Sequence, residues 1–175
     1  IVSTDDSEIA QVAEDNSAEV LLRPPELATD TATTLDVVKH VLSEIKGKWD
    51  AVALLEPTSA LRRKDDIDNA IQLMIDKKVD SVVSMGKIYL ENPNHMYVLK
   101  NNKLSKLLPR HVSGDFYFPY GVIYLTKVDR LLKTGKFYDK DSTPMFIEKF
   151  QNFEIDDAVD LLCVEAIISR RLNDG

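Results

Sequence analysis

The chain has little sulfur and lacks any long apolar run. Cys163 is the one cysteine among 175 residues, which excludes an internal disulfide and a cysteine-based zinc site. No stretch of about 18 apolar residues occurs, so we expect no transmembrane helix. A single thiol suits a reducing cytoplasm, where we expect the protein to reside. We also expect Cys163 to pack in the core, on the inner face of the last helix.

Basic residues are in the minority. The 22 lysines and arginines are outnumbered by 29 acidic residues, which gives a net charge of −7. General nucleic-acid binding needs a basic surface, so we do not expect it here. The hydrophobic fraction of 44% and the charged fraction of 29% are typical of a soluble domain. The length is enough for one domain with a substantial core.

Short apolar runs alternate with segments of helical periodicity along most of the chain. This alternation predicts an α/β fold, with helices on both faces of a mostly parallel sheet. The all-apolar run at residues 51–55 predicts a strand at the centre of that sheet. The other expected strands are residues 1–4, 18–22, 81–85, 122–125 and 145–150, and the main expected helices are residues 31–48, 65–78, 128–133 and 156–171.

The segment 87–118 has no helical period and divides the chain. Residues 97–104 contain Asn101-Asn102 between two short apolar runs, a pattern that predicts a hairpin with a tight turn. We therefore expect an α/β core at residues 1–86 and 119–175, with an inserted arm at 87–118. A loop of that length usually has a role of its own, and its apolar side chains would form a large exposed patch. We predict that the arm forms a homodimer; its apolar residues are Tyr89, Met96, Tyr97, Val98, Leu104, Leu107 and Leu108.

Three segments follow the ends of expected strands. Ligands of open α/β sheets bind beyond the carboxyl ends of the strands, so these segments are candidates for a binding site. They are LRPPELATDTA at residues 22–32, LLEPTSALR at 54–62 and FEID at 153–156.

With IVSTD at residues 1–5 and PYGVIY at 119–124, these segments resemble motifs of the acylneuraminate cytidylyltransferases. That family comprises the CMP-sialic acid synthetases and relatives that act on other nonulosonic acids. The matches keep their order along essentially the whole chain. The resemblance implies a Rossmann-like fold of the nucleotide-diphospho-sugar transferase type. It also implies a Mg²⁺-dependent transferase that converts CTP and a nonulosonic acid into a CMP-sugar and pyrophosphate.

The chain departs from the family pattern in ways that leave alternatives open. The glycine-rich segment that binds the triphosphate in the family has no counterpart, so we expect this chain alone to turn over CTP poorly. Glu56 occupies a position where the family usually has Gln, and Glu154 occupies the position of an Asp. Tyr120 occupies the position of an Asn, and Phe118 that of a frequent Arg. The chain could instead be a non-catalytic or truncated relative serving as a dimerisation or regulatory module. It could also be a cytidylyltransferase for another sugar acid such as Kdo.

By the resemblance, Arg23, Ala32 and Thr34 bind the nucleotide. Arg23 follows a strand and precedes two prolines, which stiffen the loop. The alternative is a solvated arginine, with Asp30 or Thr31 capping the following helix.

Glu154 and Asp156 are the candidate catalytic residues and metal ligands. At spacing i and i+2 in an extended segment, both carboxylates point to the same side. Mg²⁺ takes one or two carboxylates together with substrate phosphates, and it would neutralise charge as the sugar hydroxyl attacks the α-phosphorus. The alternative is that Asp156 caps the last helix and Glu154 is exposed.

The candidate sugar-binding residues are Glu56, Arg110, Tyr124, Phe137 and Tyr138, again by the resemblance. Arginine suits the carboxylate of a sugar acid, and Arg110 could reach the site of a partner subunit. Tyr124 could equally be structural.

Glu56 is the most informative departure, because an ionised carboxylate only accepts hydrogen bonds whereas glutamine also donates. This predicts a preference for an amino-substituted nonulosonic acid. The alternative is that Glu56 binds Arg62 or a residue of the arm and touches no sugar. The cluster at residues 62–64 is expected to be a solvated face.

Overall fold

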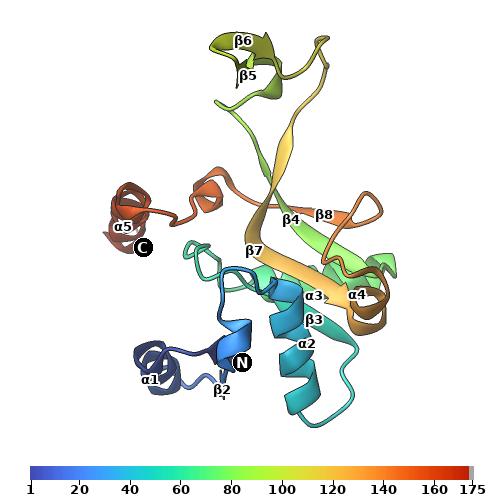
Figure 1. Ribbon diagram of the computed structural model, residues 1–175, viewed down its shortest axis with the longest axis vertical. Coiled ribbons are helices and arrows are strands. Elements are labelled where there is room, and N and C mark those ends of the chain that lie inside the picture. Colours follow the sequence, from blue (N-terminus) through green and yellow to red (C-terminus); the bar gives the residue numbers. More distant parts are fainter. Residues whose placement is uncertain (174–175) are drawn as a thin grey trace. The chain divides into compact units, whose positions relative to one another are not determined.

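A computed structural model describes residues 1–173, and side chains up to Arg170. The chain forms two compact units (Figure 1). The first contains residues 1–50 and 129–136, and the second contains residues 51–128 and those from 137 onward. None of the described helices is long and apolar enough to span a bilayer.

The first unit is built on a parallel pair of short strands, in which Val2 lies opposite Val20. The first helix begins after Asp6, whose carboxylate accepts the backbone N–H groups of Glu8 and Ile9. The elements of this unit are β1 (Val2–Thr4), α1 (Ser7–Asp15), β2 (Val20–Leu22), η1 (Pro25–Leu27), α2 (Thr34–Glu44) and most of α4 (Val128–Thr134).

Helix α2 is shorter than the periodicity predicts. It begins after Thr33, whose hydroxyl accepts the backbone N–H of Asp36 at 3.2 Å. The alternative in which Asp30 or Thr31 caps this helix is therefore wrong. Residues 29–32 form a turn instead, closed by the Ala32 N–H on the Thr29 carbonyl.

The second unit contains a four-stranded sheet in the order β3-β7-β4-β8. Strand β7 is antiparallel to both neighbours because it returns directly from the arm that β4 enters, whereas β8 is parallel to β4. The α/β fold is confirmed, but the prediction of a mostly parallel sheet is wrong, because two of the three strand pairs in this sheet are antiparallel. Strand β3 lies at the edge of this sheet rather than at its centre. The strands are β3 (Ala51–Leu54), β4 (Ser81–Lys87), β7 (Tyr117–Lys127) and β8 (Thr143–Phe146), and the helices are α3 (Asp66–Lys77), η3 (Lys149–Asn152) and α5 (Ala158–Asn173).

One face of α3 packs against this sheet and forms the core. Ala70 and Met74 contribute from the helix, and Val82, Ile123 and Leu125 contribute from the strands. The predicted strand at residues 145–150 is displaced towards the N-terminus, because residues 149–152 turn into η3.

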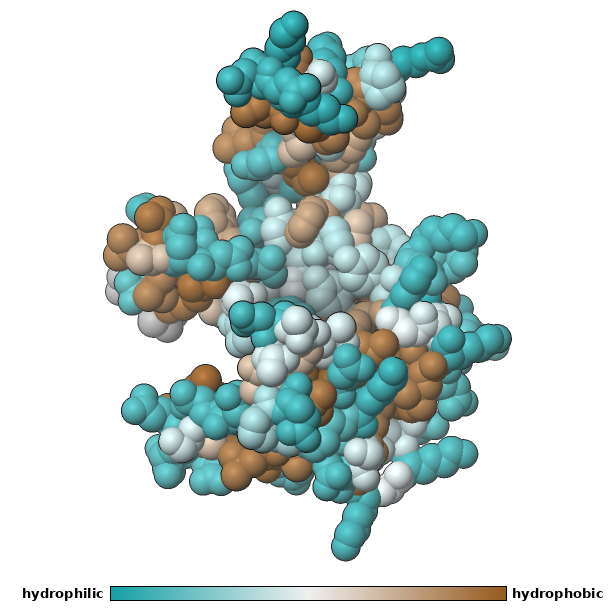
Figure 2. All heavy atoms as spheres, in the orientation of Figure 1, coloured by the Kyte–Doolittle hydropathy of each residue, from teal (hydrophilic) through white to brown (hydrophobic). Residues whose placement is uncertain are grey.

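The arm contains a hairpin that matches the predicted one. Strands β5 (Tyr97–Lys100) and β6 (Lys103–Lys106) are joined by Asn101 and Asn102, both with positive φ, as a two-residue hairpin turn requires. A short helix, η2 (Pro93–His95), precedes them. Leu99 and Leu104 are 66% and 70% exposed, and Figure 2 shows hydrophobic residues gathered on this part of the chain.

Helix α5 differs from the prediction in its burial. Cys163 is exposed, so the expectation of a core cysteine is wrong. The helix carries apolar side chains on several sides. Val164 is buried, whereas Val159 and Leu162 are each 65% exposed.

Candidate functional site

Gly121 in β7 is the point at which two of the candidate residues, Glu56 and Glu154, meet. Its backbone N–H donates to Glu154 Oε1 at 2.7 Å, and its carbonyl accepts the backbone N–H of Glu56 at 3.1 Å. A Cβ atom here would lie 2.6 Å from both Cβ and Cγ of Glu56, and 2.9 Å from Glu154 Oε1. Only glycine allows this close approach of side chains to the strand.

Ser59, in the loop after β3, holds the same carboxylate. Its hydroxyl donates to Glu154 Oε1 at 2.7 Å, and the side chain is buried. The Ile155 backbone N–H donates to the Thr58 carbonyl at 3.0 Å beside it. The motif segments 54–62 and 153–156, far apart in the sequence, are thus joined at one place.

Arg62 stabilises this loop from within. Its guanidinium donates to the carbonyls of Val122 (2.6 Å), Glu56 (3.2 Å) and Gly121 (3.4 Å). The prediction of a solvated face is therefore wrong for Arg62, although Arg63 and Lys64 are exposed. The predicted interaction of Arg62 with Glu56 is present, but its hydrogen bond is to the Glu56 backbone carbonyl, and the Glu56 carboxylate is affected only through the charge of Arg62.

Two acidic groups lie close together around Gly121. Burial raises the pKa of Glu56, the negative charge of Glu154 raises it further, and Arg62 opposes both effects. Burial also lowers the pKa of Arg62, although the arginine remains a cation. Glu56 therefore holds a proton more readily than a surface glutamate does.

Tyr124 and Tyr138 form a stacked pair in this unit, with ring centroids 5.3 Å apart. The Tyr124 hydroxyl donates to the Pro119 carbonyl at 3.0 Å, and burial is the main cause that raises the pKa of this phenol. Phe137 beside them is half-buried. Tyr124 thus has structural bonds, and sugar binding by these three aromatic residues stays a prediction.

The aromatic departures from the family pattern pack together. The Phe118 and Tyr120 rings meet edge to face at 5.1 Å. A Cβ atom at Gly86, on the neighbouring strand, would fall 2.6 Å from the Tyr120 ring. Tyr120 is accommodated because Gly86 leaves that space.

The carboxylates of Glu154 and Asp156 suit a cation whose remaining ligands are water and the phosphate oxygens of the substrate. Glu154 Oε2 accepts no hydrogen bond from a described residue. Asp156 is exposed, and its carboxylate has no partner among the described side chains, which end at residue 170. Two carboxylates with free oxygens match Mg²⁺, which completes its shell with phosphates and water. In that part of the chain, no cluster of three or more His, Cys, Asp or Glu could enclose a metal.

Asp156 does not cap α5. Asp157 takes that role by accepting the backbone N–H groups of Val159 at 2.7 Å and Asp160 at 3.0 Å. The alternative in which Asp156 is the cap is therefore wrong, and so is an exposed Glu154, whose carboxylate is bonded on one oxygen.

The candidate nucleotide residues belong to the first unit. The Arg23 guanidinium donates to the Ser3 carbonyl at 2.5 Å and to the Ser3 hydroxyl at 3.4 Å, so this arginine is bonded to β1 rather than freely solvated. Ala32 is half-buried and Thr34 is exposed at the start of α2. Their contact with a nucleotide stays a prediction.

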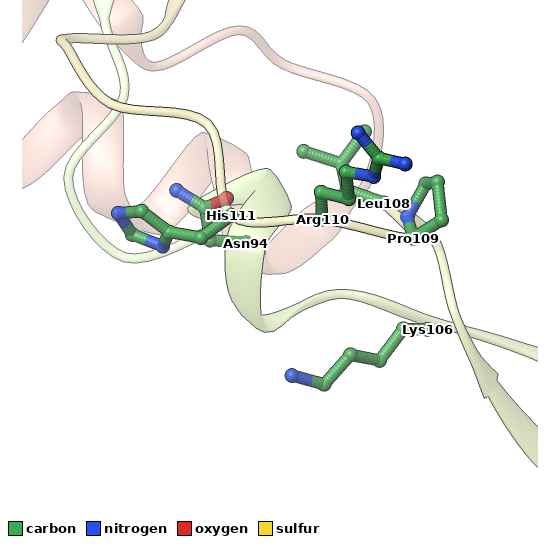
Figure 3. A pocket seen from close by; sticks show the side chains of 6 residues that line it. All are labelled: Asn94, Lys106, Leu108, Pro109, Arg110 and His111. Carbon is green, nitrogen blue, oxygen red and sulfur yellow. The ribbon is translucent and has the colours of Figure 1, made fainter.

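Arg110 is exposed in the arm, beside a hollow of about 60 Å³. Figure 3 shows that the Arg110 and His111 side chains point different ways. The hollow is far smaller than a usual small-molecule site, which measures at least about 300 Å³. This hollow is therefore too small to be a sugar pocket by itself. The hollow is lined by Asn94, Lys106, Leu108, Pro109, Arg110 and His111.

Sequence reasoning missed Gly121 and Ser59 as members of this site. A glycine inside an apolar strand pattern is a signal of close approach, and it could have identified Gly121. Ser59 lies in the candidate segment 54–62, but no sequence signal indicates its bond to Glu154, which lies 95 residues away.

The chain matches the family model described as Cytidylyltransferase over residues 1–161. It is 31% identical over 179 residues to the N-acylneuraminate cytidylyltransferase of Escherichia coli O18:K1:H7, covering 91% of this chain and 39% of that protein. It is 26% identical over 169 residues to the enzyme of that name from Streptococcus agalactiae serotype V, covering 93% of this chain and 41% of that protein. The chain thus spans about two fifths of the length of these relatives.

A shorter relative is covered more fully. The chain is 27% identical over 178 residues to the CMP-N,N'-diacetyllegionaminic acid synthase of Legionella pneumophila, covering 96% of this chain and 77% of that protein. Among solved structures, a CMP:2-keto-3-deoxy-manno-octonic acid synthetase complexed with CTP aligns with a TM-score of 0.68. That match covers 97% of this chain and 80% of the other at 15% identity, so it shows a shared fold.

Proposed function

This chain belongs to the cytidylyltransferase family, and we propose that it takes part in activating a nonulosonic acid with CTP, giving a CMP-sugar and pyrophosphate. The observation that carries the proposal is the junction at Gly121, where Glu154 and the loop after β3 meet through hydrogen bonds. A carboxylate held at such a junction suits phosphoryl-type transfer, in which positioning and charge neutralisation supply most of the catalysis.

The residues divide into two groups in this proposal. Arg23, Ala32 and Thr34, in the first unit, would hold the cytidine nucleotide. The second unit would hold the sugar acid through Glu56 and the aromatic residues Tyr124, Phe137 and Tyr138. Arg110 would bind the sugar carboxylate from the arm of a partner subunit, since a guanidinium matches a carboxylate in shape and charge.

Glu154 and Asp156 would hold Mg²⁺ in this account. Bound there, the ion would supply positive charge to the phosphates of the nucleotide. Ser59 and the Gly121 amide hold one oxygen of Glu154 and leave the other free. Arg62 fixes the backbone beneath them through its bonds to the Glu56, Gly121 and Val122 carbonyls.

We propose an amino-substituted nonulosonic acid as the preferred sugar. Glu56 replaces a residue that both donates and accepts, and a carboxylate there favours a substrate that offers extra donors. The likeness to a diacetyllegionaminic acid synthase supports this choice. The likeness to N-acylneuraminate enzymes supports N-acetylneuraminic acid as the competing substrate.

A homodimer formed through the arm is also part of the proposal. The arm exposes large apolar side chains, among them Tyr97, Leu99, Leu104 and Leu107. Patches of this kind on a monomer usually mark an interface. The lone cysteine supports a cytoplasmic location.

The test is pyrophosphate release from CTP with three acids: a diamino nonulosonic acid, N-acetylneuraminic acid and Kdo. It should be run on this chain and on the longest natural polypeptide that contains it. From the longer polypeptide we expect Mg²⁺-dependent product with the nonulosonic acids and the highest kcat/KM for the diamino acid, and from this chain alone we expect little turnover. Preference for Kdo would overturn the substrate class, and release with none of the acids would favour a non-catalytic module.

A further inference from the structure

We infer that Ser59 is the positioning residue for Glu154, fixing one carboxylate oxygen so that the other is presented to the metal. The inference rests on the proposed function, because Glu154 is a metal ligand only within that proposal. Ser59 itself does not touch substrate or metal in this account. It acts through Glu154.

Two donors converge on one oxygen of Glu154. The Ser59 hydroxyl and the Gly121 backbone N–H each donate to Oε1 at 2.7 Å. Oε2 receives no hydrogen bond from a described residue. If both oxygens accepted hydrogen bonds, fewer lone pairs would remain to bind a cation. If neither oxygen accepted one, the carboxylate group would rotate freely. This arrangement fixes the group and keeps one oxygen available.

The surroundings of Ser59 fit the role of orienting the Glu154 carboxylate. The side chain is only 1% exposed, and its hydroxyl bonds to Glu154 alone among the described residues. A buried hydroxyl loses hydration, so it needs the one acceptor it has. The length of glutamate also matters, because an aspartate would be shorter by one methylene group.

The backbone holds both ends of this contact. The Ser59 N–H donates to the Glu56 carbonyl at 3.2 Å, and the Ile155 N–H donates to the Thr58 carbonyl at 3.0 Å. The hydroxyl and the carboxylate are therefore carried by two loops that are bonded to each other.

A buried polar pair holds the chain just before Glu154. The Gln151 amide donates to Asp66 at 2.6 Å, and Gln151 is 2% exposed. The backbone N–H of Arg63 donates to the same Asp66 oxygen at 2.6 Å. The loop after β3 and the segment that carries Glu154 are thus joined on both sides of the Ser59 contact.

The experiment follows the backbone amide of Gly121 by NMR while Mn²⁺ is added to the purified chain. Mn²⁺ broadens nearby resonances even when it binds weakly, so the readout does not depend on turnover. The variants are Ser59→Ala and Glu154→Gln, which keeps the acceptor oxygen but removes the charge. The matched control is Ser81→Ala, which removes a buried hydroxyl bonded to Ser142 in the same sheet.

In the unmodified chain, we expect selective broadening of Gly121 at low Mn²⁺. Ser59→Ala should need about tenfold to a hundredfold more Mn²⁺ for the same broadening, the usual effect of losing a group that orients a metal ligand. Ser81→Ala should leave the titration unchanged. Glu154→Gln should lose the selective broadening.

Two results would overturn the inference, and they differ from each other. In the first, the Gly121 resonance of Ser59→Ala broadens at the same Mn²⁺ concentration as in the unmodified chain, whereas that of Glu154→Gln does not broaden. Ser59 then has no positioning role, and the metal role of Glu154 stands. If the unmodified chain shows no selective broadening, or Glu154→Gln keeps it, the metal role fails and the inference fails with it.

Discussion

Replacing Gly121 with alanine tests the geometry of the site most severely. The new Cβ would lie 2.6 Å from Cβ and Cγ of Glu56, whereas unstrained carbon atoms approach to about 3.5–4.0 Å. Glu56 Cβ is attached directly to the backbone, so the loop must move rather than a flexible side-chain end. Overpacking of this kind costs about 1–3 kcal/mol.

The movement would also stretch the hydrogen bonds that converge on Gly121. Its backbone N–H donates to the Glu154 carboxylate, and its carbonyl accepts hydrogen bonds from the Glu56 N–H and the Arg62 guanidinium. Weakening one of these adds about 1 kcal/mol, so we expect Gly121→Ala to lose about 2–4 kcal/mol of unfolding free energy. At about 2–4 °C per kcal/mol for a chain of this size, Tm should fall by roughly 4–16 °C.

The assay is urea and thermal unfolding of Gly121→Ala, Glu56→Gly and the double variant. Glu56→Gly removes both clashing carbons, so it should cost less in the Gly121→Ala background than alone. We expect a coupling energy of about 1 kcal/mol or more, as residues in contact usually show. Strictly additive effects, or a Gly121→Ala protein as stable as the original, would refute the steric argument.

Three further outcomes follow from the same contacts. The raised pKa of Glu56 means that this residue favours the folded state when protonated, below its ordinary pKa of 4.5, and that this contribution is lost as pH rises through the folded-state value. Glu56→Gln should therefore be more stable at pH 7 by at most about 1 kcal/mol, because the group is partly exposed, and equal stability curves at every pH would contradict this. Arg62→Ala should cost about 1–3 kcal/mol by removing three hydrogen bonds that a cation donates to backbone carbonyls, whereas the exposed Lys64→Ala control should stay within about 0.5 kcal/mol; similar losses would count against an internal role. Leu99→Asp with Leu104→Asp should give a monomer in light scattering at micromolar concentration, and an unchanged mass would exclude the arm hairpin as the dimer contact.

Local patterns in the sequence predict the order of the elements and several of their ends. The Asn101-Asn102 turn follows from residues that tolerate positive φ. The place of β3 does not follow, because an apolar run looks the same at the edge and the centre of a sheet. Cys163 fails for a similar reason, because α5 has apolar residues on several sides and the sequence does not indicate which side is covered.

The sequence predicts which residue types form the candidate site, but it does not predict which of them are in contact. The chemical types are visible, since Glu56 and Glu154 stand out beside strand ends. Their meeting is not visible, because it depends on Ser59 bonding a residue 95 positions away and on a glycine that admits both side chains. The proposed metal ligand Glu154 and its hydrogen-bond donor Ser59 are therefore far apart in the sequence and are brought together only by the fold.

The most direct measurement is CMP-sugar formation by the longest natural polypeptide, compared with its Glu154→Ala/Asp156→Ala variant over a range of Mg²⁺ concentrations. Circular dichroism should first show that the variant is folded. We predict that the unmodified protein forms product only with Mg²⁺, and that the folded variant forms none at any concentration. A folded variant with the normal rate and the normal Mg²⁺ dependence would contradict the account.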